Sequence, residues 1–406
     1  MLSSVPTPQP SASDFAALRA KFPALASSIY FDTASRGLVP LEAKTAINEL
    51  LDHRIRGDVN KAEMFESIKR VRHLYAQLIG ATPHEIAFTK NVSEGLNIAA
   101  AGLSWKAGEN VIVCPTLEHP SNIYPWLNLK AQKGIEVRNI ESKDGLMPVK
   151  EMMAAIDSKT RAVTCSLVTF APGLRSDIQE LAEYCDKRGV LFVVDAAQGI
   201  GILDIDVART PISAMSVSNQ KGLLGLYGMG FLYVREKWAE RLEPPFLSRF
   251  SVDLGTAHEA TGGGGNYSLM PGAQRFEVGN YNYVATTAVE PGLAMIITLS
   301  TRAIEARISA LTERMIEGLR RHAIPVFSPQ PGVHRAHIVA IGDTLGNQHD
   351  TTDDPKLRSL YQELSENGVR LIVRRGVLRL SFHFYNNDED VDSVIDIAGH
   401  WAKTNM

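Results

Sequence analysis

Cysteine is scarce in this chain, and the three that occur, Cys114, Cys165 and Cys185, form no closely spaced pair. The sequence therefore does not predict a disulfide scaffold or a cysteine-rich metal site, and we assign no metal ligand. Cys114 and Cys165 lie in apolar, strand-like runs, where a thiol is normally buried and reduced. We expect a reducing compartment, and hence the cytoplasm.

The chain also lacks an excess of positive charge and a membrane-length apolar run, and we expect no secretory leader. Its 42 lysines and arginines against 45 acidic residues give a net charge of −3. Such a balance offers no electrostatic attraction to nucleic acid or to an acidic membrane. No run is long and apolar enough to span a bilayer. The first residues have neither the basic nor the apolar region of a signal peptide.

The length of the chain predicts two domains. Its 406 residues exceed the usual size of a single domain, and 45% of them are apolar, which is enough for a sizeable core. We expect an N-terminal arm over residues 1–25, a large domain over 26–295 and a smaller C-terminal α/β domain over 296–406.

Apolar, β-rich runs alternate with helical patterns such as Val149–Ala155 and Ile178–Lys187. This alternation predicts an α/β fold with a mostly parallel, seven-stranded sheet and helices on both faces. The last two runs have no helix between them, so one of the two can be antiparallel. The seven runs are Glu85–Thr89, Asn110–Cys114, Val137–Ile140, Ala162–Thr169, Val190–Val194, Ala214–Val217 and Gly230–Val234.

Outside these runs, a helix is expected to begin near Asp14. The glycine-rich residues 258–273 predict a mobile loop. Thr286 to Arg321 predicts a long helix, bent or broken at some point, that leads into the small domain. Asp343–Asp354 is predicted to be a polar, exposed insertion.

Two residues predict a cofactor. Asp195 closes the apolar run Leu191–Asp195, and Lys221 follows 26 residues later in Ser218–Gly222. Alone, they would be a helix N-cap and an exposed loop lysine. Together they suit pyridoxal 5'-phosphate: the lysine forms a Schiff base with its aldehyde, and the carboxylate keeps the pyridine nitrogen protonated. The sequence therefore predicts this cofactor and an amino acid as substrate.

Polar residues near the predicted strand ends complete the cofactor site. Val92 and Ser93 follow the strand Glu85–Thr89, at a strand-to-helix junction whose backbone N–H groups can bind a phosphate. His119 follows the next strand and can lie flat over the pyridine ring. Taken singly, Ser93 would be an ordinary N-cap and His119 a polar loop residue. The remaining assignments are Ser218 and Gln220 to the phosphate and Gln198 to the phenolic oxygen of the cofactor.

An arginine in the small domain predicts the binding site of the substrate carboxylate. Arg379 stands in the alternating run Leu378–His383. Its guanidinium can hold an α-carboxylate through two parallel hydrogen bonds. Arg374 and Arg375 compete for this role, and a surface salt bridge is the alternative for Arg379 itself.

Together these motifs resemble the class V aminotransferase family of fold-type I pyridoxal phosphate enzymes. That group includes the cysteine desulfurases and the isopenicillin N epimerase-like proteins. The resemblance covers Tyr30 to about Asp392. It implies a homodimer with the active site at the interface, in which Asn280 reaches the phosphate of the neighbouring subunit. The motifs are Val92–Asn97, Glu118–Trp126, Val194–Gln198, Ser218–Lys221 and Arg275–Asn280.

Several positions depart from the pattern of this family. Desulfurases carry a catalytic cysteine before the arginine that matches Arg379, and this chain has none there, so a persulfide-forming desulfurase is not expected. Phe170 stands where many relatives have an asparagine that bonds the phenolic oxygen, and Gln220 where they often have histidine. Arg36 stands where relatives have small residues. We hypothesise that it reads a second acidic group on the substrate; the alternative is a solvated loop arginine.

The resemblance and the residues predict an enzyme that acts at Cα of an amino acid, with Lys221, His119 and Asp195 as catalytic residues. Aminotransferase comes first, with an epimerase or racemase and a β- or γ-eliminating, desulfurase-like lyase as alternatives. A catalytically silent binding protein of this fold is disfavoured by the intact Lys221–Asp195 pair. A nicotinamide dehydrogenase is disfavoured because Gly225–Gly230 has the reverse of the dinucleotide-binding spacing.

Overall fold

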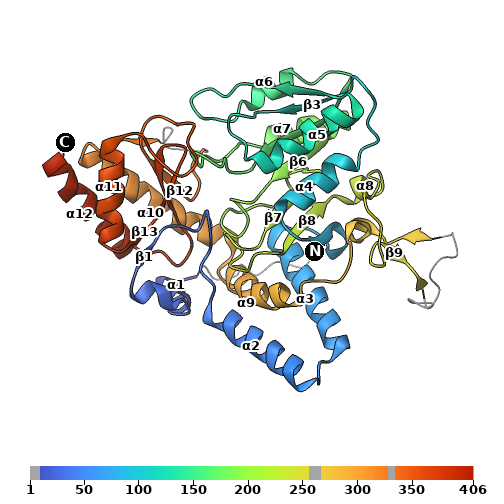
Figure 1. Ribbon diagram of the computed structural model, residues 1–406, viewed down its shortest axis with the longest axis horizontal. Helices are drawn as coiled ribbons and strands as arrows, with labels where there is room; N and C mark the ends of the chain where they lie inside the picture. The colour runs from blue at the N-terminus through green and yellow to red at the C-terminus, as the bar shows by residue number, and fades with distance from the viewer. Residues whose placement is uncertain (1–9, 256–266, 328–333, 406) are drawn as a thin grey trace, which may run out of the picture.

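The computed structural model describes residues 10–255, 267–327 and 334–405 (Figure 1). A seven-stranded sheet in the order β2-β8-β7-β6-β5-β3-β4 forms its larger part. β8 pairs antiparallel with both β2 and β7, and the other neighbours are parallel. The predicted mostly parallel α/β sheet is confirmed, including the antiparallel run. The strands are β2 (Ile86–Thr89), β3 (Asn110–Val113), β4 (Glu136–Asn139), β5 (Thr160–Ser166), β6 (Leu191–Asp195), β7 (Ala214–Ser218) and β8 (Gly230–Val234).

The central strands are continuous apolar runs because both faces of the sheet are covered. In β6, Leu191 and Val193 belong to one hydrophobic cluster, whereas Phe192 and Val194 belong to the other. Helices lie over both clusters, as predicted (Figure 1). The helices of this part are α3 (Lys61–Ile79), α4 (Val92–Ala101), α5 (Tyr124–Lys133), α6 (Val149–Ala154), α7 (Gln179–Arg188), α8 (Glu236–Ala239) and α9 (Tyr283–Leu299).

A smaller antiparallel sheet in the order β11-β12-β15-β14 forms the C-terminal part. α10 and α11 contact this sheet and α12 packs on both helices, so the expected C-terminal α/β part is present (Figure 1). The insertion Asp343–Asp354 joins β12 to α11 and is mostly exposed. The strands are β11 (Val326–Phe327), β12 (Ile338–Ile341), β14 (Ile372–Arg374) and β15 (Val377–Ser381); the helices are α10 (Thr301–Arg321), α11 (Pro355–Glu366) and α12 (Asp388–Asn405).

The long helix predicted over Thr286–Arg321 is broken. α9 and α10 meet at 81°. Ser300 lies between them with φ of 62°, and its side chain accepts a hydrogen bond from the Ala303 N–H, which caps α10. Among the described residues, no single helix is long and apolar enough to cross a membrane, and only this bent pair meets that criterion by length and composition.

The N-terminal segment runs along the small sheet before it reaches the large part. α1 (Ala12–Arg19) is held there because Arg19 donates two hydrogen bonds, 2.8 and 2.9 Å long, to the Asp390 carboxylate. β1 (Ile29–Tyr30) pairs in parallel with β13 (Val369–Arg370). The chain then enters α2 (Leu41–Arg56), which packs on α9. Residues 32–37 are thereby placed between the two parts.

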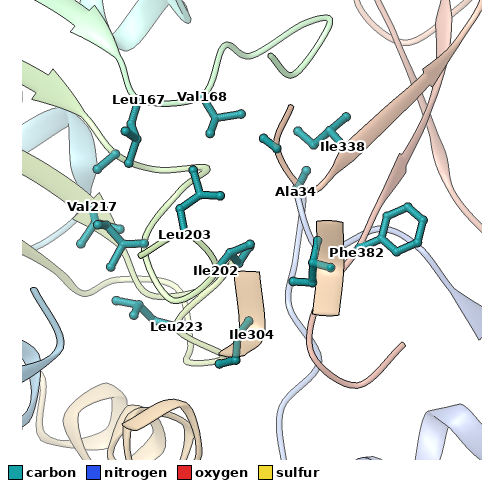
Figure 2. Packing of buried hydrophobic residues seen from close by; sticks show 14 of the residues in the cluster. Ala34, Leu167, Val168, Ile202, Leu203, Val217, Leu223, Ile304, Ile338 and Phe382 are labelled. Carbon is teal, nitrogen blue, oxygen red and sulfur yellow. The ribbon is translucent and has the colours of Figure 1, made fainter. Parts of the chain in front are cut away.

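One hydrophobic cluster joins the two parts. Figure 2 shows two groups of these residues facing each other. Leu203 and Ile202 of the large part lie with Ile304 of α10 in one group, and Ala34, Ile338 and Phe382 form the other. The predicted domain boundaries stay a prediction. The loop predicted over residues 258–273 falls largely outside the described residues.

Candidate active site

Lys221 lies on the loop between β7 and β8, where close backbone approaches require glycine. A Cβ at Gly222 would lie 2.2 Å from the carbonyl oxygen of Ile200. A Cβ at Gly37 would lie 2.2 Å from the carbonyl oxygen of Lys221 itself. The Gly37 N–H donates to the Gln220 carbonyl at 2.7 Å, so the N-terminal segment is attached directly to the Lys221 loop.

A cavity of about 290 Å³ opens where β6 and β7 end and α4 begins. Eight of the predicted site residues line it, and Phe170 is also part of its wall. The structure thus brings together side chains that are up to 129 positions apart in the chain. The eight residues are Val92, Ser93, His119, Asp195, Gln198, Ser218, Gln220 and Lys221.

Asp195 and Lys221 supply opposite charges in this cavity. Asp195 is buried at the end of β6, and its Oδ1 accepts a hydrogen bond from the Ala197 N–H at 2.9 Å. Burial raises the pKa of Asp195. Burial lowers the pKa of Lys221 to about 8, and the Asp195 charge opposes that fall. A lysine with this pKa can both release and take up a proton near neutrality.

The N-terminus of α4 forms the part of the cavity that suits a phosphate. Its first backbone N–H groups point out of the helix, and the helix dipole favours an anion there. The Val92 N–H donates to Ser218 Oγ at 2.8 Å. Ser93 Oγ donates to Ser121 Oγ at 2.9 Å. These hydroxyls, with Gln220 beside them, are uncharged donors around a positive helix end, so the residues fit the phosphate of the predicted cofactor.

His119 is held as a neutral ring. Its Nδ1 accepts hydrogen bonds from the backbone N–H and the hydroxyl of Ser121, at 3.1 and 3.0 Å. Burial, followed by the positive charge of Lys221, lowers the pKa of His119 to about 4. The edge of the ring meets Phe170 at 5.0 Å between ring centroids. An uncharged, oriented imidazole suits stacking against an aromatic cofactor.

Glu118 is a site residue that the sequence reasoning missed. It is buried, and its Oε1 accepts from the Ser166 N–H at 2.7 Å. Its Oε2 accepts from Ser166 Oγ at 2.6 Å and from Asn122 Nδ2 at 2.7 Å. Burial raises the pKa of Glu118 to about 7. These bonds fasten the loop that carries His119 to the end of β5. The signals in the sequence were the place of Glu118 beside His119 and at the start of the motif Glu118–Trp126.

Gln198 was predicted to reach the phenolic oxygen of the cofactor. Its Nε2 donates to the Ala34 carbonyl at 3.0 Å, and its buried Oε1 has no hydrogen-bond partner among the described residues, so the contact with the cofactor stays a prediction. Reversing the amide would exchange the two atoms. Gln198 therefore lines the cavity with one buried polar atom available to a bound group.

Arg379 is buried and contacts Phe170, a residue that lines the Lys221 cavity. Its Nη1 donates to the Phe170 carbonyl at 3.0 Å, and its Nη2 to Ser35 Oγ at 3.2 Å. Its buried Nε has no hydrogen-bond partner in the described part of the chain. The guanidinium also lies 5.6 Å from the centroid of the Phe170 ring. Burial lowers the pKa of Arg379 to about 10, so it keeps its charge at neutral pH.

The two competing arginines contact other groups. Arg374 pairs with Asp350, and Arg375 donates to the Thr116 carbonyl at 2.6 Å. Only Arg379 of the three has a hydrogen bond to a residue that lines the Lys221 cavity. The geometry therefore favours Arg379 over its neighbours for the carboxylate role.

Two predicted residues lie outside this cavity. Arg36 lines a neighbouring cavity of about 640 Å³. Asn280 lines a third cavity, of about 240 Å³, together with Thr89 and Lys90. Asn280 is thus not part of the Lys221 cavity of its own chain.

All three cysteines are buried. Burial raises the pKa of the Cys114, Cys165 and Cys185 thiols, so none is a reactive thiolate near neutrality.

Comparison with known proteins identifies the family. The model of the aminotransferase class-V family matches residues 29–394. The chain belongs to this family. A probable cysteine desulfurase of Pyrococcus abyssi is 28% identical over 401 residues, covering 95% of this chain and 97% of the relative. The uncharacterized aminotransferase YcbU of Bacillus subtilis is 26% identical over 378 residues, covering 93% of this class V chain and 95% of the relative.

Solved structures share the fold of this class V chain. A cysteine desulfurase from Thermococcus onnurineus has a TM-score of 0.82 and 26% identity, with 96% of this chain and 98% of that chain covered. The cystine C-S lyase C-DES, solved with its product cysteine persulfide, also has a TM-score of 0.82, with 93% and 99% covered. At 23% identity, the second likeness shows the fold alone.

Family membership confirms the predicted class V resemblance and the fold-type I architecture. Together with the Lys221–Asp195 arrangement, it confirms pyridoxal 5'-phosphate as the cofactor. The roles assigned to the individual residues of the site stay predictions.

Proposed function

We propose that this class V enzyme transfers the amino group of an amino acid, with Lys221 as the base that moves the Cα proton. The observation that carries this proposal is the set of titratable groups around the cavity. Lys221, with its pKa of about 8, faces a buried Asp195 and a neutral His119. When bound, pyridoxal phosphate supplies the electron sink that acidifies the Cα–H bond.

Amino transfer needs one base that takes a proton at Cα and returns it at another carbon. Lys221 is suited to this because burial holds its pKa near the working pH, where a proton carrier is most effective. Epimerisation by two bases needs a second proton carrier. Among the described lining residues, His119 has its Nδ1 engaged and its pKa lowered to about 4, so it is a poor second base.

Arg379 would orient the substrate. Its burial favours a bidentate ion pair with the α-carboxylate, because few waters compete there. Its bonds to Phe170 and Ser35 fix the guanidinium in advance, so little entropy is lost on binding. A fixed carboxylate would in turn fix the direction of the Cα–H bond relative to Lys221.

A C–S eliminating lyase is the second candidate, favoured by the desulfurase names of the relatives. Transfer of sulfur to a cysteine of this chain is disfavoured. All three thiols are buried, and none of them lines the Lys221 cavity. A lyase of this chain would therefore release its sulfur product without an enzyme-bound persulfide.

We further propose a homodimer in which Asn280 of the partner subunit completes each site. The segments around Asn280 support this: Gly279 N–H donates to Ser248 Oγ, and Asn282 Nδ2 to the Gly228 carbonyl. Large apolar side chains on these joined segments are exposed, which is typical of an interface. They are Tyr227, Phe246, Leu247, Tyr267, Val278 and Val284.

The test follows the visible absorbance of the holoenzyme while L- and D-amino acids are added without keto acid. Amino transfer predicts bleaching that persists until a keto acid is supplied, because the amino group stays on the cofactor. Persistent absorbance with release of ammonia and a side-chain fragment would replace this proposal by the lyase. Persistent absorbance with deuterium incorporation and inversion at Cα in D₂O would replace it by an epimerase.

A further inference from the structure

A second cavity, of about 640 Å³, is lined by the N-terminal segment and the small domain. Arg36 belongs to the N-terminal segment, and Arg374 to β14. Arg358 and Tyr361 belong to α11, and Asp350 to the insertion between β12 and α11. This polar cavity lies outside the set of residues that surround Lys221.

The two acidic groups of this cavity already have partners. Asp350 accepts a hydrogen bond from Arg374 and lies 2.6 Å from His349 Nδ1. Both oxygens of Asp353 accept from Gln348 Nε2, at 2.7 and 2.8 Å.

Unlike these two carboxylates, the guanidinium of Arg36 has no hydrogen-bond partner among the described side chains. The backbone N–H of Arg36 donates to the Asp32 carbonyl and its carbonyl accepts from the Tyr30 hydroxyl, but among the described residues its guanidinium has no hydrogen bond or ion pair. The Asp32 carboxyl interacts with Arg36 electrostatically, and burial raises the pKa of Asp32. Lining arginines outnumber lining aspartates three to two. The cavity therefore has an excess of positive charge and one unpaired arginine.

Residues of the two cavities, or next to them in the chain, are in contact with each other. Gly37, next to Arg36, donates to the carbonyl of Gln220, which lines the Lys221 cavity. The ring of His349, next to Asp350, stacks on Phe170 at 5.9 Å between centroids and 21° between planes. Phe170 also lines the Lys221 cavity. A substrate whose Cα lies near Lys221 would therefore have this second cavity as its neighbour.

Resting on the proposed function, we propose that the second cavity receives the substrate side chain and that Arg36 binds an anionic group at its end. The substrate class is then an amino acid with an acidic side chain. The two anionic ends are read by different arginines: Arg379 takes the α-carboxylate and Arg36 the distal group. Arg374, held by Asp350, adds positive potential without being free to bind.

The experiment measures binding apart from turnover. The holoenzyme is titrated with acid and amide pairs, aspartate against asparagine and glutamate against glutamine, and with 2-aminoadipate against norleucine. The first change in visible absorbance after rapid mixing, recorded before the slower bleaching by amino transfer, gives each Kd. The variants are Arg36→Gln, which keeps length and polarity without charge, and Arg54→Gln, a control that removes a charge from another exposed arginine, on α2.

The wild type is expected to bind at least one acid more tightly than its uncharged counterpart. Arg36→Gln should raise the Kd of that acid about tenfold or more, since hydrogen bonds to charged groups are the strong ones. The Kd of the amide should stay unchanged, and Arg54→Gln should match the wild type. The acid that binds most tightly relative to its uncharged counterpart has the side-chain length that best matches the distance from Cα to Arg36.

Two results would overturn this inference while the proposed function stands: absence of any acid preference in the wild type, or equal weakening of acid and amide by Arg36→Gln. If no amino acid changes the absorbance at all, the proposed function fails, and the inference fails with it.

Discussion

The Glu118→Gln substitution gives a stability change that depends on pH. Glu118 is buried beside His119, and its two oxygens accept three hydrogen bonds from Ser166 and Asn122. Glutamine keeps the shape of the side chain, and its oxygen can still accept from the Ser166 N–H. What the variant loses is the titrating proton. Any cost of rearranging the Asn122 amide is independent of pH and shifts the whole stability curve equally.

The magnitude follows from the pKa of Glu118, which burial raises from 4.5 to about 7. Below pH 4.5 the carboxyl is protonated in both the folded and the unfolded protein. Between pH 4.5 and 7 only the folded protein keeps the proton, so the wild type loses stability as the pH rises. At about 1.4 kcal/mol per pKa unit, the total loss is about 3 kcal/mol, and most of it falls between pH 5 and 8.

The assay is urea unfolding of both proteins at several values from pH 5 to pH 8, at one protein and one cofactor concentration, because ligand and partner binding add to apparent stability. The free energy of unfolding of Glu118→Gln minus that of the wild type should increase by about 2–3 kcal/mol across this range. Parallel stability curves would refute the reasoning, since they would show that Glu118 is already ionised in the folded protein at pH 5.

Three further predictions concern activity and the core. Lys221→Ala should lose the absorbance of a lysine-bound cofactor and at least about 10²-fold in kcat, as expected for loss of a general base; an active, coloured variant would contradict the cofactor assignment. Arg379→Lys should raise KM for amino acids through loss of the bidentate pair, while the cofactor absorbance stays unchanged. Arg72 and Glu277 form a buried ion pair at 2.6 Å, so Arg72→Met should cost about 3–5 kcal/mol in urea unfolding. Adding Glu277→Gln to Arg72→Met should recover part of the lost free energy of unfolding, because no unpaired charge then stays buried. If Arg72→Met costs the same with and without Glu277→Gln, the buried charge is not the cause.

The strands were predictable because burial on both faces leaves a direct mark on the sequence. β8 has the predicted bounds, since all five of its residues are buried and the turns beside it are clear. The run Ala162–Thr169 was less accurate, because β5 spans Thr160–Ser166. Leu167 and Val168 are apolar because they are part of the core beyond the strand end. Apolar residues in a sequence indicate burial. They indicate the bounds of a strand only where the buried run and the strand end at the same residue.

The cofactor site was predictable to the extent that chemistry restricts residue type. Few side chains can replace Lys221 or Asp195, so their spacing was informative. The attachment of Glu118 to Ser166 was not predictable, because it joins residues 48 positions apart. The stacking of His349 on Phe170 likewise joins residues 179 positions apart. Such contacts are set by tertiary packing, which no local pattern records.

The antiparallel pairing of β7 with β8 has a consequence for how the enzyme would reset after each turnover. Ser218 and Gly230 lie opposite each other in that pair, so the loop bearing Lys221 has both its ends fixed at neighbouring points of the sheet. With the cofactor bound, this tether would hold the lysine amine inside the cavity throughout turnover, at an effective concentration that no free amine in solution would match. The lysine would therefore need no diffusion to return to its place for the next turnover.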